Sequence, residues 1–316
     1  MDLLRAEIAK LRRPLVFWGL LGLVLVGTSV GAAYLETAKL QYRNAIVAPT
    51  QAIQHPAPCK ALGGLQPGPK CEAVRARDVE LARQFLSETT NDSLRALSHL
   101  EPLGSGGFAA GIVTSTFGAL VIMLLAGAHI GGEWTGHTAK TLFVQENRRG
   151  RVILAKFGSL WIAGVALLVG TWAGMAITGQ LVARIFPIPL HPSPALQWAY
   201  SWPQLARALL VIGAFAAVGT FSASIVRNTL GTFFLGFGII VASMVLSAFD
   251  ALFAWTPGYW VASWMGFERT LLSLDHIWPD VFGGPQNPAV GAVGLSLLLI
   301  GCLAASVSWI RRVDVA

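Results

Sequence analysis

The sequence predicts an all-α, polytopic membrane protein with six transmembrane helices, and three observations predict it. Only 12% of the 316 residues are charged, about half the share usual in soluble domains, whereas 54% are hydrophobic and the mean hydropathy is +0.60. Several apolar runs approach or exceed the ~20 residues that cross about 30 Å of hydrocarbon. Lys and Arg gather between these runs, as in many membrane proteins, which accounts for the net charge of +7. No basic patch alternates with aromatic residues, so we expect no nucleic-acid partner.

The N-terminal residues 2–13 are expected to form an amphipathic helix in the headgroup layer, in contact with membrane lipid. Leu4, Ile8 and Leu11 recur at helical spacing, with basic residues around them. A basic flank that only fixes orientation is a compatible interpretation. Residues 14–34 form the first predicted span. Its apolar run is long for a cleaved signal peptide, so we expect an uncleaved signal anchor.

Residues 35–105 are polar and are expected to form an extracytoplasmic helical insertion within a single transmembrane domain of residues 1–316. Cys59 and Cys71 bracket a loop rich in Gly and Pro. In an oxidising compartment we expect them to form a disulfide, and two unpaired thiols are the alternative. The pattern over residues 72–100 is helical, with a second helix capped at residues 91–92.

The remaining five spans are apolar runs bounded by charged, Pro-rich or aromatic stretches. A Pro-rich connection is expected over residues 184–203. Residues 250–289 contain five Trp and Tyr residues and few charges, so we expect short, re-entrant-like helices held at the outer leaflet by aromatic side chains. The predicted spans cover residues 107–130, 157–183, 205–226, 229–249 and 289–310.

The distribution of basic residues predicts the orientation. About twelve Lys and Arg lie in the N-terminus, the 131–156 loop, the turn at Arg227 and the C-terminus, against about three in the two short loops on the other side. We therefore expect both termini and the 131–156 loop to be cytoplasmic in a plasma membrane, which in a bacterium is the inner membrane.

The predicted spans carry almost no ionisable residues, and this argues against an ion-coupled transporter, which needs charges inside the bilayer. His129, at the end of the second span, is interpreted as an interfacial group rather than a proton relay. The sequence has no zinc-protease motif and no facing pair of carboxylates. We therefore expect no catalytic residue, no metal site and no cofactor in this chain.

The loop between the second and third spans has an acidic residue, then glycine and threonine, then a basic pair and a lysine that opens the third span. This order resembles the first cytoplasmic loop of type-2 ATP-binding-cassette exporter permeases, although here His137 separates the glycine from the threonine. An amphipathic N-terminal helix, six spans and a re-entrant-like segment agree with the same family. The residues that carry the match are Glu133, Gly136, Thr138, Lys140, Arg148, Arg149 and Lys156.

The resemblance implies that the chain is the transmembrane subunit of an exporter and that the seven loop residues couple it to ATPase partners. Two separate ATPase subunits would bind ATP and Mg²⁺, and a helix over about residues 135–144 would sit in a cleft of one of them. Two permease copies, or this chain and a similar one, would pair. The second and fifth spans would border the pathway of a hydrophobic or amphipathic cargo such as a lipid, antibiotic or drug. The expected lining residues are Thr114, Thr116, Phe117, Met123, Phe233, Phe237 and Met244.

Two other functions remain as alternatives. A non-transporting scaffold or sensor would use the disulfide-closed outer segment for recognition, and deletion of residues 50–100 would then abolish its function. A secondary transporter would drive flux from an ion gradient without ATP, against the scarcity of charges in the spans.

Overall fold

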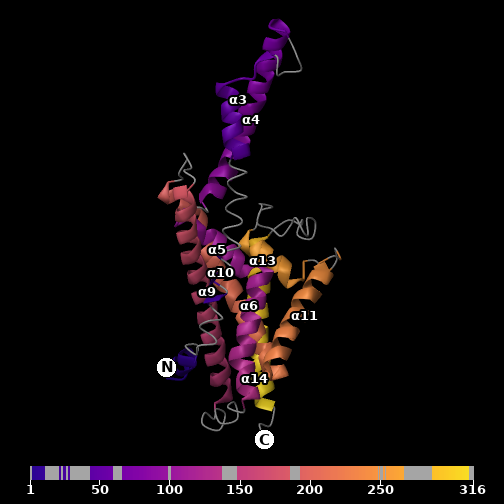
Figure 1. Ribbon diagram of the computed structural model, residues 1–316. Coiled ribbons are helices and arrows are strands. Elements are labelled where there is room, and N and C mark those ends of the chain that lie inside the picture. Colours follow the sequence, from indigo (N-terminus) through magenta and orange to yellow (C-terminus); the bar gives the residue numbers. More distant parts are fainter. Residues whose placement is uncertain are drawn as a thin grey trace. The chain divides into compact units, whose positions relative to one another are not determined.

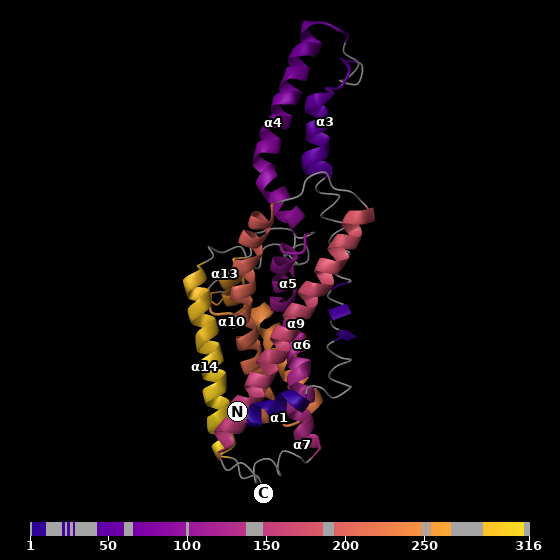
Figure 2. The same ribbon diagram turned by 90° about the vertical axis from the view of Figure 1, so that its left-hand side faces the viewer.

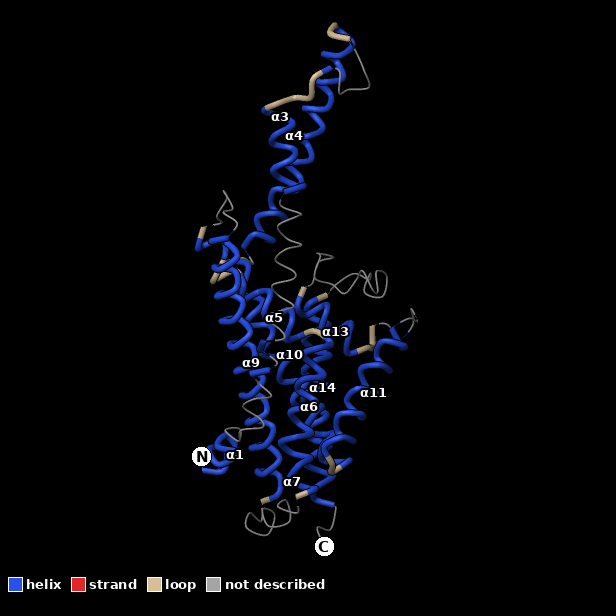
Figure 3. Tube along the Cα trace, viewed as in Figure 1, coloured by secondary structure: helices blue, strands red, loops and turns tan. Residues whose placement is uncertain are grey.

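The computed structural model describes most of the chain, and all regular secondary structure in the described residues is helical (Figure 3). Four of the described helices are long and apolar enough to cross a membrane, so the chain is a multi-pass membrane protein of the all-α class. The described residues are 2–10, 21–22, 24–25, 28, 43–59, 66–98, 101–136, 148–185, 193–247, 249, 252, 254–266 and 287–312.

The chain packs into two compact units. We call the first the core unit; it contains Met1–Gly27, Phe108–Trp172 and Pro203–Ala316. We call the second the hairpin unit; it contains Thr28–Gly107 and Ala173–Trp202.

The second predicted span is a broken helix. It consists of α5 (Ser105–Thr114), α6 (Thr116–Ala126), the π-helical turn η3 (Gly127–Gly131) and α7 (Gly132–Thr135). The break lies at Ser115, whose ψ of 173° is extended rather than helical. At this bend the backbone passes so close to itself that a side chain at position 118 would collide with the Val113 carbonyl, so glycine is required there.

The third, fourth and sixth predicted spans are confirmed as long apolar helices: α9 (Arg149–Ile185), α10 (Pro194–Val226) and α14 (Pro288–Arg312). The fifth appears as α11 (Thr229–Ser247), whose described apolar part is shorter than a full span. Most of the first predicted span lies outside the described residues. Six spans therefore remain a prediction.

The Pro-rich connection expected over residues 184–203 is wrong in its second half, because α10 already begins at Pro194. Proline is favoured at the start of a helix, where its missing N–H would have had no partner. The Ser193 hydroxyl also accepts a hydrogen bond from the Leu196 N–H at 3.4 Å. Pro203 is tolerated within the helix although it cannot donate to the preceding turn.

A short helix, α13 (Pro257–Met265), forms within the predicted aromatic segment and packs against α14. Gly291 and Gly294 allow the close approach: a Cβ at position 291 would lie 2.6 Å from the Trp260 carbonyl oxygen, and one at 294 would collide with the Trp260 ring. Small residues at such spacing let helices meet in lipid. Residues 267–286 lie outside the described residues.

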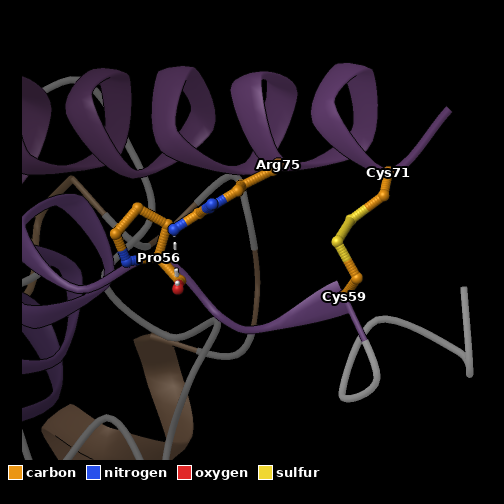
Figure 4. Close-up of a disulfide and its surroundings, with 4 residues drawn as sticks. All are labelled: Pro56, Cys59, Cys71 and Arg75. Atoms are coloured by element: carbon orange, nitrogen blue, oxygen red, sulfur yellow. Dashed lines mark hydrogen bonds between the residues drawn. A yellow bond between two sulfur atoms is a disulfide. The ribbon is translucent and has the colours of Figure 1, made fainter. Parts of the chain in front are cut away.

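In the hairpin unit, α3 (Ala48–Gln54) and α4 (Pro69–Ser98) lie side by side (Figure 1). The predicted disulfide is confirmed: it joins Cys59 to Cys71 with 5.8 Å between the Cα atoms (Figure 4). The predicted second helix at residues 91–92 is wrong, because α4 continues through them without a break. Extending an existing helix costs less than nucleating a new one, so a polar pair that resembles a cap does not end it.

Candidate functional site

The N-terminal helix α1 (Asp2–Lys10) lies crosswise over the ends of α7 and α9 in the core unit (Figure 2). Leu3 packs against a buried cluster of Val152, Ile153 and Ile310. Leu4 approaches Gly158, where an added Cβ would lie 3.3 Å from it. The apolar face of α1 therefore rests on protein, and this positions its charged residues against the second and third spans.

Four charged side chains from three chain segments form a closed ion-pair ring, which we define as Glu7, Lys10, Glu133 and Lys156. The Lys10 ammonium lies 2.7 Å from Glu7 Oε1 and 2.7 Å from Glu133 Oε1. The Lys156 ammonium lies 3.3 Å from Glu7 Oε2 and also pairs with Glu133 Oε2. Each lysine thus bridges both carboxylates, and each carboxylate gives one oxygen to each lysine.

The ion-pair ring is buried and electrically balanced. Glu7, Glu133 and Lys156 are 1%, 7% and 3% exposed, and only Lys10 reaches solvent appreciably. Two carboxylates and two ammonium groups cancel, which matters because an unpaired buried charge is very costly. Burial raises the pKa of Glu7, but the hydrogen bond from His129 and the nearby Lys156 and Lys10 outweigh it, so the pKa falls from 4.5 to about 2.

Lys10 shows the complementary effect. Burial lowers the pKa of its ammonium group, but hydrogen bonds to Glu133 and Glu7, together with their charges, raise it above the ordinary value of 10.5. Glu7 and Lys10 therefore both favour their charged forms at neutral pH. Burial alone would favour their neutral forms, and the ion pairs of the ring outweigh that effect.

His129 and Ser159 extend the ring into the helix packing. His129 Nε2 lies 2.9 Å from Ser159 Oγ and 3.3 Å from Glu7 Oε2. The Ser159 hydroxyl donates to the Lys156 carbonyl at 2.8 Å, so its oxygen is left to accept from His129. This network places the hydrogen on Nε2 of His129, where Ser159 Oγ and the Glu7 carboxylate share it. His129 lies in η3, a π-helical turn of a kind that often occurs at functional sites.

The opposite side of this segment packs against the start of α11. A Cβ at Gly127 would lie 2.6 Å from the Thr229 carbonyl oxygen, and one at Gly131 would lie 2.7 Å from the Asn228 carbonyl oxygen. The Arg227 guanidinium lies 4.8 Å from the centre of the Trp134 ring, a favourable cation–π distance. The end of the second span is therefore wedged between the ion-pair ring and the fifth span.

The predicted coupling residues separate into three groups. Glu133, in α7, and Lys156, in α9 (Arg149–Ile185), belong to the ion-pair ring. Thr138 and Lys140 lie outside the described residues. Gly136 ends α7 and donates its N–H to the Gly132 carbonyl at 2.9 Å.

The basic pair of the loop lies at the start of α9. Arg148 is exposed. Arg149 is partly buried and donates to the Ile310 carbonyl at 3.3 Å, which ties α9 to the end of α14. The two arginines are therefore not equivalent: Arg148 faces outward, and Arg149 also holds two helices together.

The predicted lining residues of the second span surround its break. Thr114 is buried, and its hydroxyl donates to the Ala110 carbonyl at 2.8 Å. Thr116 begins α6, and Phe117 is 40% exposed. Phe117 also borders a small apolar cavity of about 10 Å³. That cavity is too small for a cargo, and the assignment of these residues to a cargo pathway remains a prediction.

The helices α6 and α11, which carry predicted lining residues of the second and fifth spans, pack together (Figure 1). Met123 is buried, and a Cβ at Gly236 would lie 2.6 Å from its Cγ. The Phe233 and Phe237 rings stack at 6.4 Å. The side chain of Met244 is outside the described part of the structure.

Sequence reasoning missed Glu7, Lys10 and Ser159. A signal for Glu7 was present: it lies three residues after Leu4 and four before Leu11, so this acidic residue falls on the apolar face of an amphipathic helix. A charge in that position needs a buried partner. Ser159 offered no comparable signal.

The contacts of the ion-pair ring are those of a structural element. Both carboxylates of the ring are taken up by lysines, and among the described residues no group of three His, Cys, Asp or Glu side chains could hold a metal ion. What the arrangement can do is fix three segments to one another. A scan against protein-family models found no match, and comparisons with curated proteins and with solved structures found none either.

Proposed function

We propose that this chain is the transmembrane permease subunit of an ATP-driven exporter. Separate ATPase subunits would bind ATP and Mg²⁺ and engage the 131–156 loop on the cytoplasmic side. The permease would act with a second copy and move a hydrophobic or amphipathic cargo outward across the plasma membrane. The resemblance of the loop residues to type-2 ATP-binding-cassette permeases supports this proposal.

The ion-pair ring is the observation that carries the proposal. A loop that only connects two spans needs no buried charges at its ends. Here Glu133 and Lys156, at the two ends, pair with each other and with Glu7 of α1. Removing one partner of such a buried pair costs about 3–5 kcal/mol. The ring would therefore make the loop, α1 and two helices move as one body.

A mechanical path from the loop to a third helix supports the same proposal. Gly131 is pressed against the Asn228 carbonyl at the start of α11, and Trp134 lies under Arg227. A push on the loop would displace α7, and α11 could not stay in place because no space separates them. The second and fifth spans, which the proposal assigns to the cargo pathway, would respond together.

The first experiment isolates the chain in mild detergent from the membranes of its own cell and identifies the proteins that co-purify. We expect ATPase subunits, and ATP hydrolysis in the purified complex. The variant Arg148→Glu should reduce both, because Arg148 is exposed at the end of the loop. Arg312→Glu is the matched control: it makes the same charge change at an exposed arginine of α14, a helix whose end is bonded to Arg149 at the start of α9.

The second experiment separates coupling from binding. Glu133→Gln should leave the ATPase subunits bound but uncouple hydrolysis from transport of a fluorescent lipid in proteoliposomes. Absence of any ATPase in the purified material, or equal effects of Arg148→Glu and Arg312→Glu, would count against the exporter.

One observation favours the alternative of a scaffold or sensor, namely that the disulfide-closed hairpin is present. Replacement of residues 50–98 by a short linker discriminates the two functions. A scaffold would lose its function, whereas an exporter would retain ATPase binding through the 131–156 loop.

A further inference from the structure

The second span breaks at Ser115 although its sequence does not forbid a continuous helix. Residues 105–126 contain no proline. At Ser115, φ is −72° and ψ is 173°. The value of φ already suits an α-helix, so the ψ of a single residue separates the broken helix from a continuous one.

The break is stabilised on the side of α5 but not on the side of α6. The Ser115 N–H and hydroxyl both donate to the Ile112 carbonyl, at 3.2 Å and 2.6 Å. In α6, the first backbone bond runs from the Ala119 N–H to the Ser115 carbonyl at 3.0 Å. The N–H groups of residues 116–118 precede that bond and have no partner within the helix. The Ser115 side chain does not cap them.

A continuous helix would pair these N–H groups. The Thr116 N–H would donate to the Ile112 carbonyl, which the Ser115 hydroxyl occupies in the broken helix. The next two N–H groups would likewise find carbonyls four residues earlier. Unpaired backbone groups are costly in apolar surroundings, and the cavity beside the break is lined mainly by apolar side chains. The two shapes therefore differ by only a few hydrogen bonds.

Gly118 makes the bend possible. A Cβ at this position would collide with the Val113 carbonyl in the broken helix. In a continuous helix that carbonyl belongs to the regular bond pattern, and alanine is the most favourable residue. The cavity of about 10 Å³ between α5, α6 and α9 leaves space at the bend for about one water molecule.

We propose that Ser115 is the hinge of the second span, which alternates between the broken helix of this structure and a continuous helix. The hinge separates α5 from α6, which packs against α11 and leads into η3 and α7. Straightening would turn α5 relative to α6, and it would rearrange Thr114, Thr116 and Phe117, which are predicted to line the cargo pathway. The inference rests on the proposed function only for the source of the motion, a push on the 131–156 loop.

Two substitutions should lock the span in opposite shapes. Gly118→Ala excludes the bend through the collision with the Val113 carbonyl and should favour the continuous helix. Thr116→Pro should favour the bend, because position 116 is the first residue of α6, where proline is preferred. The extended ψ of Ser115 also suits a residue before proline, whereas a continuous helix would lose a backbone bond at position 116.

Pulsed double electron–electron resonance on the full-length chain in proteoliposomes measures the shape of the span. Spin labels are attached at Ile112→Cys and Leu124→Cys, one on each side of the hinge. Cys302 is replaced by Ser in this labelled chain, and the native disulfide is kept. A continuous helix places the two labelled positions about 18 Å apart along its axis.

The two locks should act differently on this distance. Thr116→Pro should keep the distance of the labelled chain without further substitution, and Gly118→Ala should shift it to about 18 Å. Gly238→Ala is the matched control. It makes the same change in the apolar helix α11, where an added Cβ would have no close neighbour among the described residues, so the distance should not change.

A fixed bend gives a different result. Gly118→Ala would then fail to fold, or it would keep the original distance and melt at a lower temperature than Gly238→Ala. Either outcome overturns the hinge, and so does a changed distance in Thr116→Pro. The test is independent of the ATPase: a shifted distance in Gly118→Ala supports the hinge even when no ATPase co-purifies, and an unshifted one removes it even when the ATPase does.

Discussion

Ion pairs in two regions of this molecule use the same chemical groups but differ in what they can stabilise. In the ion-pair ring, Glu133 and Lys156 are 7% and 3% exposed. Two of its four pairs, Lys10–Glu133 and Lys156–Glu7, join residues 123 and 149 positions apart in the chain. In α4, Glu80 and Arg83 are one turn apart at 3.7 Å, and their side chains are 60% and 64% exposed. Water screens the second pair and is excluded from the first. Burial, rather than the number of charges, therefore determines how much an ion pair stabilises the fold.

The hairpin unit is held together by a different means. Most of the described side chains of α4 are exposed, so α3 and α4 bury little apolar surface against each other in the part that the structure describes. The Cys59–Cys71 disulfide closes the segment between these two helices covalently. The core unit contains the buried ion-pair ring, whereas the hairpin contains the disulfide. Separate substitutions can remove either one without touching the other.

The largest expected effect is the loss of one member of the ion-pair ring. Glu133→Gln leaves two lysines with one carboxylate and should lower the free energy of unfolding by about 3–5 kcal/mol. Thermal unfolding of the purified protein in detergent measures it. The double variant Glu133→Gln/Lys156→Gln should cost less than the sum of the single variants, because it leaves no net buried charge. Strict additivity of the two substitutions, or an equal loss of stability in Glu80→Gln in α4, would contradict the larger contribution expected from the buried ion pairs.

A somewhat smaller effect is expected from the disulfide. The pair Cys59→Ser/Cys71→Ser should destabilise the hairpin by about 3 kcal/mol, because an open segment gains conformational freedom when unfolded. Limited proteolysis should then cut within residues 43–98 while the core unit stays intact. Cys302→Ser is the control, since Cys302 is a free cysteine. Equal proteolysis of all these variants would show that the disulfide contributes nothing.

The close packing of the end of the second span against the start of α11 can be tested with two neighbouring glycines. A Cβ at Gly131 would meet the Asn228 carbonyl at 2.7 Å, whereas one at Gly132 would have its nearest contact, Thr229 Oγ1, at 3.9 Å. Gly131→Ala should therefore destabilise the protein by about 1–3 kcal/mol through overpacking. Gly132→Ala should be neutral or slightly stabilising, because alanine favours a helix. Equal melting temperatures of the two variants would contradict the close contact between Gly131 and the Asn228 carbonyl.

The smallest effect is expected from pH near neutrality. The pKa of Glu7 falls from 4.5 to about 2 on folding, so its contribution is present above pH 4.5 and is lost as the pH falls toward 2. The raised pKa of Lys10 keeps its contribution present below pH 10.5. Between pH 5 and pH 9 these two groups should not change the stability of the ring. The difference in melting temperature between wild type and Glu7→Gln, measured across this range, should stay constant, and a steep change near pH 6–7 would contradict it.

The amino-acid pattern predicted some parts of the fold well because they depend on local information. Apolar runs in α9, α10 and α14 are long enough to identify membrane helices without knowledge of their neighbours. Cys59 and Cys71 are close in the chain and flank a Gly/Pro-rich loop, so their pairing could be predicted too. The start of α10 and the continuity of α4 were predicted wrongly, since prolines and polar residues are compatible with both a helix and a connection.

Composition and apolar run length are enough to identify this chain as a membrane protein and to find its long apolar helices, although not their ends. The pairing of Glu133 and Lys156 with Glu7 and Lys10 of the N-terminal helix arises from tertiary packing. The reason is physical: hydrophobicity and helix period act over a few residues at a time. The partner of a buried charge is chosen by the packing of helices that lie more than a hundred residues apart in the chain.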